Sequence, residues 1–168
     1  LGNFKKLVEL ITIDPSMLQY LNGTQNSKNA PNENYARELL ELFTIGKGDA
    51  VGPGDYTNYM EDDIVQIARA LTGWNHLDID NLTKVQAGYN PNLHDTGDKQ
   101  LSHRFNDVII TNGDENEYRN VIDIIFQKDE VARFISRKLY RWFVHFDINS
   151  EVEANIIEPM AQMLIGDN

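Results

Sequence analysis

Apolar residues recur every three to four positions through most of the chain, and this spacing predicts amphipathic helices. The pattern predicts helices over residues 4–12, 15–21, 33–45, 61–72, 116–127, 130–146 and 151–164, the last of them interrupted at Pro159. Between residues 75 and 112 the periodicity fades, and Lys84–Tyr89 and Phe105–Thr111 are predicted as short strands flanking a polar loop. The expected fold class is mostly α: a single helical domain with a small β-hairpin or irregular insert around residues 80–112.

The predicted helix at 33–45 has the clearest separation of polar and apolar residues. At 100° per residue its polar arc consists of Glu33, Asn34, Arg37, Glu38, Glu41 and Thr44. Its apolar arc consists of Tyr35, Ala36, Leu39, Leu40, Leu42 and Phe43. Pro31 and Asn32 suit the start of this helix, and Gly46 suits its end.

Two further helix starts and one loop are indicated by short polar patterns. Asn58 with Glu61, and Asp114 with Glu117, have the spacing of a capping box. The glycine-rich segment 46–54 has no GxxxxGK[ST] pattern, so it is predicted as a flexible connection rather than a phosphate cradle.

Length and charge narrow the classes of protein. A chain of 168 residues is long enough for one domain with a core, and the way both ends adjoin helical pattern suggests a fragment of a longer protein. Its formal net charge of −11 argues against binding to nucleic acid, which requires a positive surface. No apolar run approaches 18 residues, so no membrane span is expected. The absence of cysteine excludes disulfides and thiolate chemistry.

Four motifs occur in order along the chain: Asn32–Gly46 (NENYARELLELFTIG), Ala68–Trp74 (ARALTGW), His94–Lys99 (HDTGDK) and Ala132–Leu139 (ARFISRKL). Together they resemble a large uncharacterised bacterial family, the domain of unknown function 1800. The resemblance implies an exported protein, periplasmic or on the cell surface, and no known activity. As partners it implies an exported sulfatase-like protein encoded nearby and the remaining parts of its own full-length chain.

Two positions depart from the family pattern. The family usually has Thr where this chain has Met60, so we expect Asn58 to take over the capping of the helix that follows. The Leu-Gly that usually follows the third motif is Leu101-Ser102 here, which weakens the case for a tight glycine turn.

The polar arc of the helix at 33–45 has two interpretations. Glu33, Arg37 and Glu41 follow each other at i, i+4 spacing, which is typical of a solvated face stabilised by ion pairs. Alternatively Asn32, Glu33, Arg37 and Glu38 line a cleft, where paired carboxylates could perform acid–base chemistry.

The segment His94–Lys99 combines an imidazole, two carboxylates and an ammonium within six residues. His94 and Asp95 are candidate ligands of a divalent cation, although a third ligand would have to come from elsewhere. Lys99 is a candidate ligand-binding residue. A polar turn whose side chains cap local N–H groups explains the same pattern.

Arg133, Arg137 and Arg141 recur at i, i+4 and i+8, with Lys138 and His145 alongside, in an otherwise acidic chain. We expect this basic ridge to dock on acidic residues of the same chain, with the arc of Glu33, Glu38 and Glu41 as the first choice. The alternative is an anion site for phosphate or sulfate.

Two functions remain open from the sequence. The first is a binding or assembly module with no required catalysis. The second is a hydrolase-like enzyme in which Glu33, Glu38, His94 and Asp95 converge, with or without a divalent cation. No other cofactor is expected, and whether the protein is an enzyme is left undecided.

Overall fold

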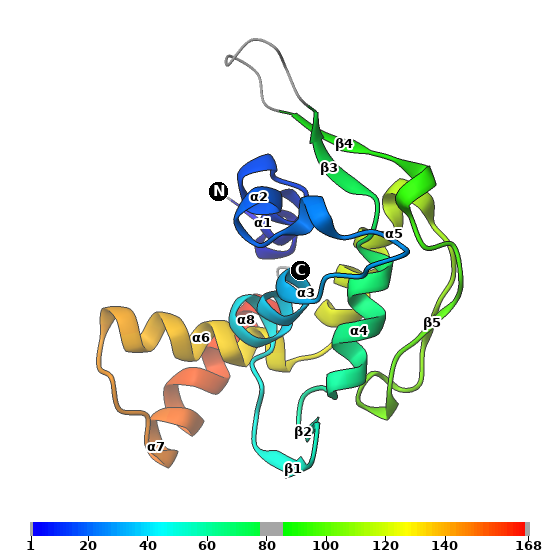
Figure 1. The fold of residues 1–168 in the computed structure, drawn as a ribbon. Helices are drawn as coiled ribbons and strands as arrows, with labels where there is room; N and C mark the ends of the chain where they lie inside the picture. Colours follow the sequence, from blue (N-terminus) through cyan, green and yellow to red (C-terminus); the bar gives the residue numbers. More distant parts are fainter. Residues whose placement is uncertain (1, 78–85, 167–168) are drawn as a thin grey trace.

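The computed structural model describes residues 2–77 and 86–166 and confirms the expected mostly α fold, with small antiparallel hairpins added to it (Figure 1). The helices are α1 (Phe4–Thr12), α2 (Pro15–Tyr20), α3 (Asn34–Glu38), α4 (Glu61–Ala70), α5 (Glu117–Phe126), α6 (Glu130–Phe143), α7 (Ser150–Val152) and α8 (Glu158–Gly166). None of the described helices has both the length and the hydropathy required to cross a bilayer.

The core forms where α4 and α5 pack together, with α1 against α5 and α3 against α4 (Figure 1). Most of the apolar positions that the periodicity placed on one face of these four helices become buried, although Leu7 and Leu42 stay about half exposed. Side chains with no exposed surface include Leu39, Leu40, Ile64, Ile67, Ala68, Val121 and Ile122. The helical pattern therefore determines which residues pack, and burial of these side chains is the main favourable term in folding.

The third helix differs from the expected regular helix over 33–45. It is α-helical only over Asn34–Glu38 and continues as a π-helical segment, Leu39–Thr44. The N–H groups of Ile45 and Gly46 both donate to the carbonyl of Leu40, at 3.1 and 2.9 Å. The extra residue per turn rotates everything after Leu39 about the helix axis, so the predicted polar arc does not stay on one face.

The start of α4 is capped by a residue other than the predicted one. The carboxylate of Asp63 accepts the N–H of Met60 at 2.8 Å, which satisfies a donor at the helix start. Asn58 instead donates to the carbonyls of Ile45 and Gly46, at 3.0 and 3.1 Å. The expectation that Asn58 caps this helix is wrong, because its amide closes the end of the preceding helix instead.

The insert between α4 and α5 contains two of the hairpins. β3 (Trp74–Leu77) pairs with β4 (Gln86–Tyr89), and β5 (Lys99–Gln100) pairs with β6 (Ile109–Ile110). Part of the predicted first strand, residues 84 and 85, lies outside the described residues.

The second predicted strand is shorter than expected, because its first residue, Phe105, closes the 3₁₀ turn His103–Phe105. The glycine-rich connection predicted as flexible contains a third hairpin, β1 (Ala50–Gly52) with β2 (Asp55–Tyr56).

The C-terminal helices form a layer of their own at the lower left of Figure 1, where α8 packs against α6. The predicted break at Pro159 occurs just before it, as the π-helical segment Glu153–Ile157. Since proline has no N–H to donate, the regular ladder cannot continue unchanged through this position. Helix α6 ends at Phe143, three residues before the predicted end.

Gly46 provides a test of the junction between the third helix and α6. Its φ is +68°, and a Cβ added there would lie 2.6 Å from the ring of Phe134. We expect Gly46→Ala to lower the free energy of unfolding by about 2–4 kcal/mol, since it adds left-handed backbone strain to a steric clash. Gly52→Ala is the matched control, because a Cβ there meets nothing within 4 Å. Denaturant unfolding measures the free energy of unfolding of both variants. Equal values for Gly46→Ala and Gly52→Ala would contradict the left-handed conformation and close packing of Gly46.

Candidate functional site

His94, Lys99 and Glu117 form a buried ionic cluster between the HDTGDK segment and the first turn of α5. The His94 Nε2 lies 3.0 Å from Glu117 Oε2, and the Lys99 Nζ lies 2.5 Å from Glu117 Oε1. The side chains of Lys99 and Glu117 have no exposed surface, and that of His94 has 1%. A buried ammonium requires a counter-charge, and here Glu117 supplies it.

Backbone groups complete the cluster. The carbonyl of Thr72 lies 2.8 Å from His94 Nδ1, and because a carbonyl only accepts, this ring nitrogen carries a hydrogen. Glu117 Oε2 also accepts the N–H of Gly113 at 3.1 Å, and Lys99 donates to the carbonyl of Asp95. The imidazole is therefore held at both nitrogens, and its orientation is fixed.

Asp95 lies beside this cluster and pairs with Arg69 of α4 in a two-pronged contact. Its two carboxylate oxygens lie 2.7 Å from Arg69 Nε and 3.3 Å from Arg69 Nη2, and one also accepts the N–H of Gly97 at 2.9 Å. Burial would raise the pKa of Asp95, but the hydrogen bonds from Arg69 and Gly97 outweigh it and hold the pKa below its ordinary value of 3.8.

Thr72 joins the second and third motifs directly. Its hydroxyl accepts the N–H of Asp95 at 2.8 Å and donates to the carbonyl of Arg69 at 2.7 Å. Its neighbour Gly73 turns the chain with a φ of +94°, where a Cβ would lie 3.0 Å from the carbonyl oxygen of Asn90. The Thr-Gly pair is therefore required by the close approach of two backbone segments.

Asn26 connects the first motif to the second. Its buried amide donates to the carbonyl of Ala68 at 2.8 Å and accepts the N–H of Asn32 at 2.9 Å. The backbone carbonyl of Asn26 also accepts the N–H of Gly73 at 3.2 Å. Segments that are far apart in sequence are thus joined through one side chain and its backbone.

Two residues of the predicted polar arc, Arg37 and Glu41, contact residues at the start of α4. Arg37 pairs with Glu33 at 3.2 Å and with Glu61 at 2.8 Å, while Glu41 accepts the hydroxyl of Tyr59 at 3.2 Å. The predicted pairing of Arg37 with Glu41 is absent from the described residues, since the π-helical segment turns Glu41 away. Within the described part of the chain, the Glu38 side chain makes neither an ion pair nor a hydrogen bond.

Asn32 acts as a turn residue, because its side chain accepts the N–H of Asn34 at 3.0 Å. Over residues 2–77 and 86–166, no hydrogen bond or ion pair joins His94 or Asp95 to Glu33 or Glu38. The same ranges contain no group of three His, Cys, Asp or Glu side chains placed to hold a metal ion.

The basic ridge docks on acidic residues of the same chain, but not on the predicted arc. Arg137 pairs with Glu130 at 2.6 Å and with Glu153 at 2.5 Å, and Arg133 pairs with Glu158 at 2.8 Å. The expectation that the arc of Glu33, Glu38 and Glu41 would receive the ridge is wrong. The two helices do meet, since Lys138 donates to the carbonyl of Leu42 at 2.5 Å, but Arg133 and Arg137 pair with the C-terminal helices.

These pairs shift the ionisation of their members. Hydrogen bonding to Glu153 raises the pKa of Arg137 above its usual range and outweighs the opposing effect of partial burial, with Glu130 adding to the rise. The Arg133 guanidinium lowers the pKa of Glu158 to about 2. Arg141 is exposed, and no ion pair reaches it from the part of the chain that the structure describes.

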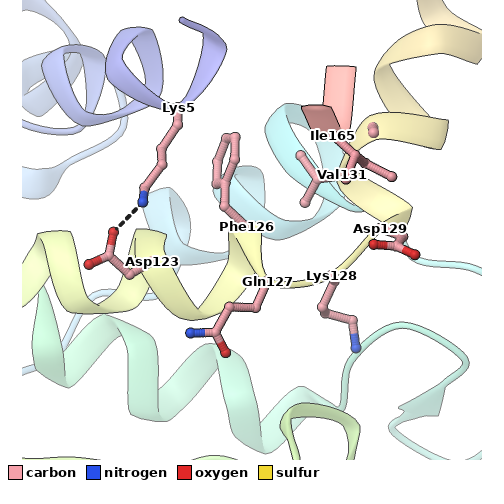
Figure 2. Close-up of a pocket in the computed structure, with 9 residues that line it drawn as sticks. Lys5, Asp123, Phe126, Gln127, Lys128, Asp129, Val131 and Ile165 are labelled. Carbon is pink, nitrogen blue, oxygen red and sulfur yellow. Dashed lines mark ion pairs between the residues drawn. The ribbon is translucent and has the colours of Figure 1, made fainter. Parts of the chain in front are cut away.

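Two hollows on the surface could receive a ligand. One, of about 410 Å³, lies where α1, α5, the start of α6 and α8 meet, and Figure 2 shows Lys5 and Asp123 paired at 2.6 Å on its wall. The other, of about 440 Å³, has Arg69 and Asp98 of the second and third motifs in its lining. The charged groups that line both hollows include members of the ion pairs described above.

Sequence reasoning identified His94, Asp95 and Lys99 but missed the groups that hold them. Glu117 was assigned only to a helix start, and its contact with the N–H of Gly113 partly bears this out. A signal was present, because a Glu in the first turn before an apolar face lies at the edge of the core. Arg69 lies beside Gln66 on the polar face of α4, so its position in the pattern gave no comparable signal.

Comparison with known proteins gives one match. A family model described as a protein of unknown function (DUF1800) matches residues 1–168. Neither the curated proteins nor the solved structures contain a significant match.

Glu117→Gln tests the buried cluster. The amide cannot balance the charge of Lys99, and we expect the free energy of unfolding to fall by about 3–5 kcal/mol. Glu115→Gln removes a carboxylate from an exposed neighbouring position and should change it by about 0.5 kcal/mol or less. Urea unfolding at neutral pH compares the two, and a Glu117 variant as stable as the Glu115 variant would refute the role of the ion pair.

Arg137→Ala tests the ridge. We expect a loss of about 1–3 kcal/mol, since Glu130 and Glu153 both lose their charged hydrogen-bond partner. The control is Arg141→Ala on the same helix, which should change the free energy of unfolding by about 0.5 kcal/mol or less. Both variants are measured at low protein concentration. Thermal melting with and without sulfate also tests for an anion site: a sulfate-induced stabilisation that disappears only in Arg137→Ala would indicate anion binding instead.

Proposed function

The chain belongs to the DUF1800 family, whose function is unknown, and from its exposed surface we propose that it is a binding or assembly module of an exported bacterial protein. The observation that carries the proposal is a group of exposed apolar side chains, close together in sequence, at the end of α6. We call it the aromatic surface, and it consists of Leu139, Trp142, Phe143, Val144 and Phe146.

The aromatic surface is far more exposed than apolar side chains in a core. Trp142 is 83% exposed, Phe143 82% and Phe146 78%. Single exposed apolar residues are common, but a contiguous cluster of aromatic side chains is typical of a protein interaction site. Aromatic residues are also enriched among those that contribute most to binding affinity.

The candidate catalytic residues support binding over catalysis. The imidazole of His94 is buried against Glu117 and Thr72, and Asp95 is paired with Arg69. Glu33 is paired with Arg37. A hydrolase site at His94 and Asp95 would first have to break these contacts, so we place the enzyme hypothesis second.

The family resemblance supplies a location and a first partner to test. We propose that the domain acts outside the cytoplasm, in the same compartment as an exported sulfatase-like protein encoded nearby, which is a partner to test in its own right. The net charge of −11 makes nucleic acid an unfavourable partner.

A photocrosslinking amino acid at position 142 tests the proposal in the native host. We expect irradiation to give a protein adduct of defined mass, because Trp142 is the most exposed side chain of the aromatic surface. The matched control carries the same crosslinker in place of Tyr20, which is 78% exposed on α2, a helix that lies away from the far end of α6 in Figure 1. Cell fractionation of the adduct tests the location.

The proposal fails if position 142 gives no protein adduct, or if positions 142 and 20 give the same adducts. Recovery of the adduct in the cytoplasmic fraction would refute the proposed export and leave the binding role standing.

A further inference from the structure

We propose that the aromatic surface joins two copies of this chain in a symmetric pair. This inference rests on the proposed binding function and names the partner. In a two-fold pair the same patch is used on both sides, so the patch has to be self-complementary in shape, area and charge.

The area of the patch suits such a pair. An aromatic side chain offers 150–250 Å² of surface, so Trp142, Phe143 and Phe146 together expose roughly 400–600 Å². A specific interface of standard size buries about 800 Å² per partner. The aromatic rings with Leu139 and Val144 therefore supply most of one half of a dimer interface.

The backbone under the patch is already ordered. The N–H groups of Val144 and His145 both donate to the carbonyl of Tyr140, at 2.8 and 3.1 Å, and the N–H of Asp147 donates to the His145 ring at 3.2 Å. The His145 ring packs on the Phe146 ring, with centroids 4.7 Å apart. Because these groups are held before association, less conformational entropy is lost on binding.

The charges around the patch also suit a second copy. Two chains of −11 repel each other, so they can associate only where the negative charge is locally offset. Arg133 and Arg137 are already paired within the chain, but Arg141, next to Trp142, is exposed and has no ion pair among the described residues. Exposed Asp147 and Glu151 follow the patch, so its rim carries both signs, as a surface that contacts itself requires.

The position of the patch leaves space for a partner. Helix α6 runs away from α4 and α5, and its far end, together with α7, projects from the rest of the molecule (Figure 1). Two copies can therefore bring these ends together while the remaining parts of the two acidic chains stay apart.

Sedimentation of the purified chain over a range of concentrations tests the inference. We expect a reversible monomer–dimer equilibrium for the wild type. Replacing Trp142 and Phe146 together by Ala should weaken it on the order of 30-fold or more, because central aromatic anchors carry most of the affinity. The control Tyr20→Ala removes an equally exposed aromatic side chain and should leave the equilibrium unchanged. Circular dichroism melts verify that both variants fold.

Each outcome decides the inference. The inference is supported if the wild type dimerises, the double variant Trp142→Ala with Phe146→Ala dissociates, and Tyr20→Ala still dimerises. A wild type that stays monomeric at the highest attainable concentration overturns it, as does a dimer that the double variant leaves intact. If the chain is monomeric but the crosslinker at position 142 captures a different protein, only the second copy is refuted, whereas no adduct at all refutes the binding function as well.

Discussion

Pairing of buried charge is the constraint on which the rest of the structure depends. Lys99 and Glu117 have no exposed surface, and an unpaired charge in such a place would destabilise the fold by several kcal/mol. Their contact fixes the insert between α4 and α5 against the start of α5, and His94 and Asp95 are positioned as a consequence. The chemistry concentrated in the HDTGDK segment is thus directed inward, to hold the segment in place.

A second layer of ion pairs organises the C-terminal helices in a different way. Arg133 and Arg137 are partly exposed and reach Glu153 and Glu158 on the segments that follow α7. Exposed or half-exposed pairs contribute little individually, but a connected set with two-pronged arginine geometry fixes orientation. This layer places α8 along α6 and leaves the end of α6 uncovered, where the aromatic surface lies.

The helices could be predicted from the sequence because their signal is local, and their ends differ from the predicted ones by only a few residues. The π-helical segment at Leu39–Thr44 could not, since the bond from the Ile45 N–H to the Leu40 carbonyl competes closely with the regular one. The site was predicted in part: His94, Asp95 and Lys99 attracted attention by their chemistry. Their partners Glu117 and Arg69 lie 18 to 26 residues away, and only the folded chain identifies them.

The way Asn26, Thr72 and Glu117 hold the polar insert affects how the molecule opens. An insert made of short hairpins and turns would ordinarily fluctuate piece by piece, exposing its backbone to water one turn at a time. Here any partial detachment would leave either an ammonium or a carboxylate alone in a dry interior. Intermediate openings are therefore higher in energy than both the closed state and complete release, so the insert behaves as one cooperative unit with the ends of α4 and α5.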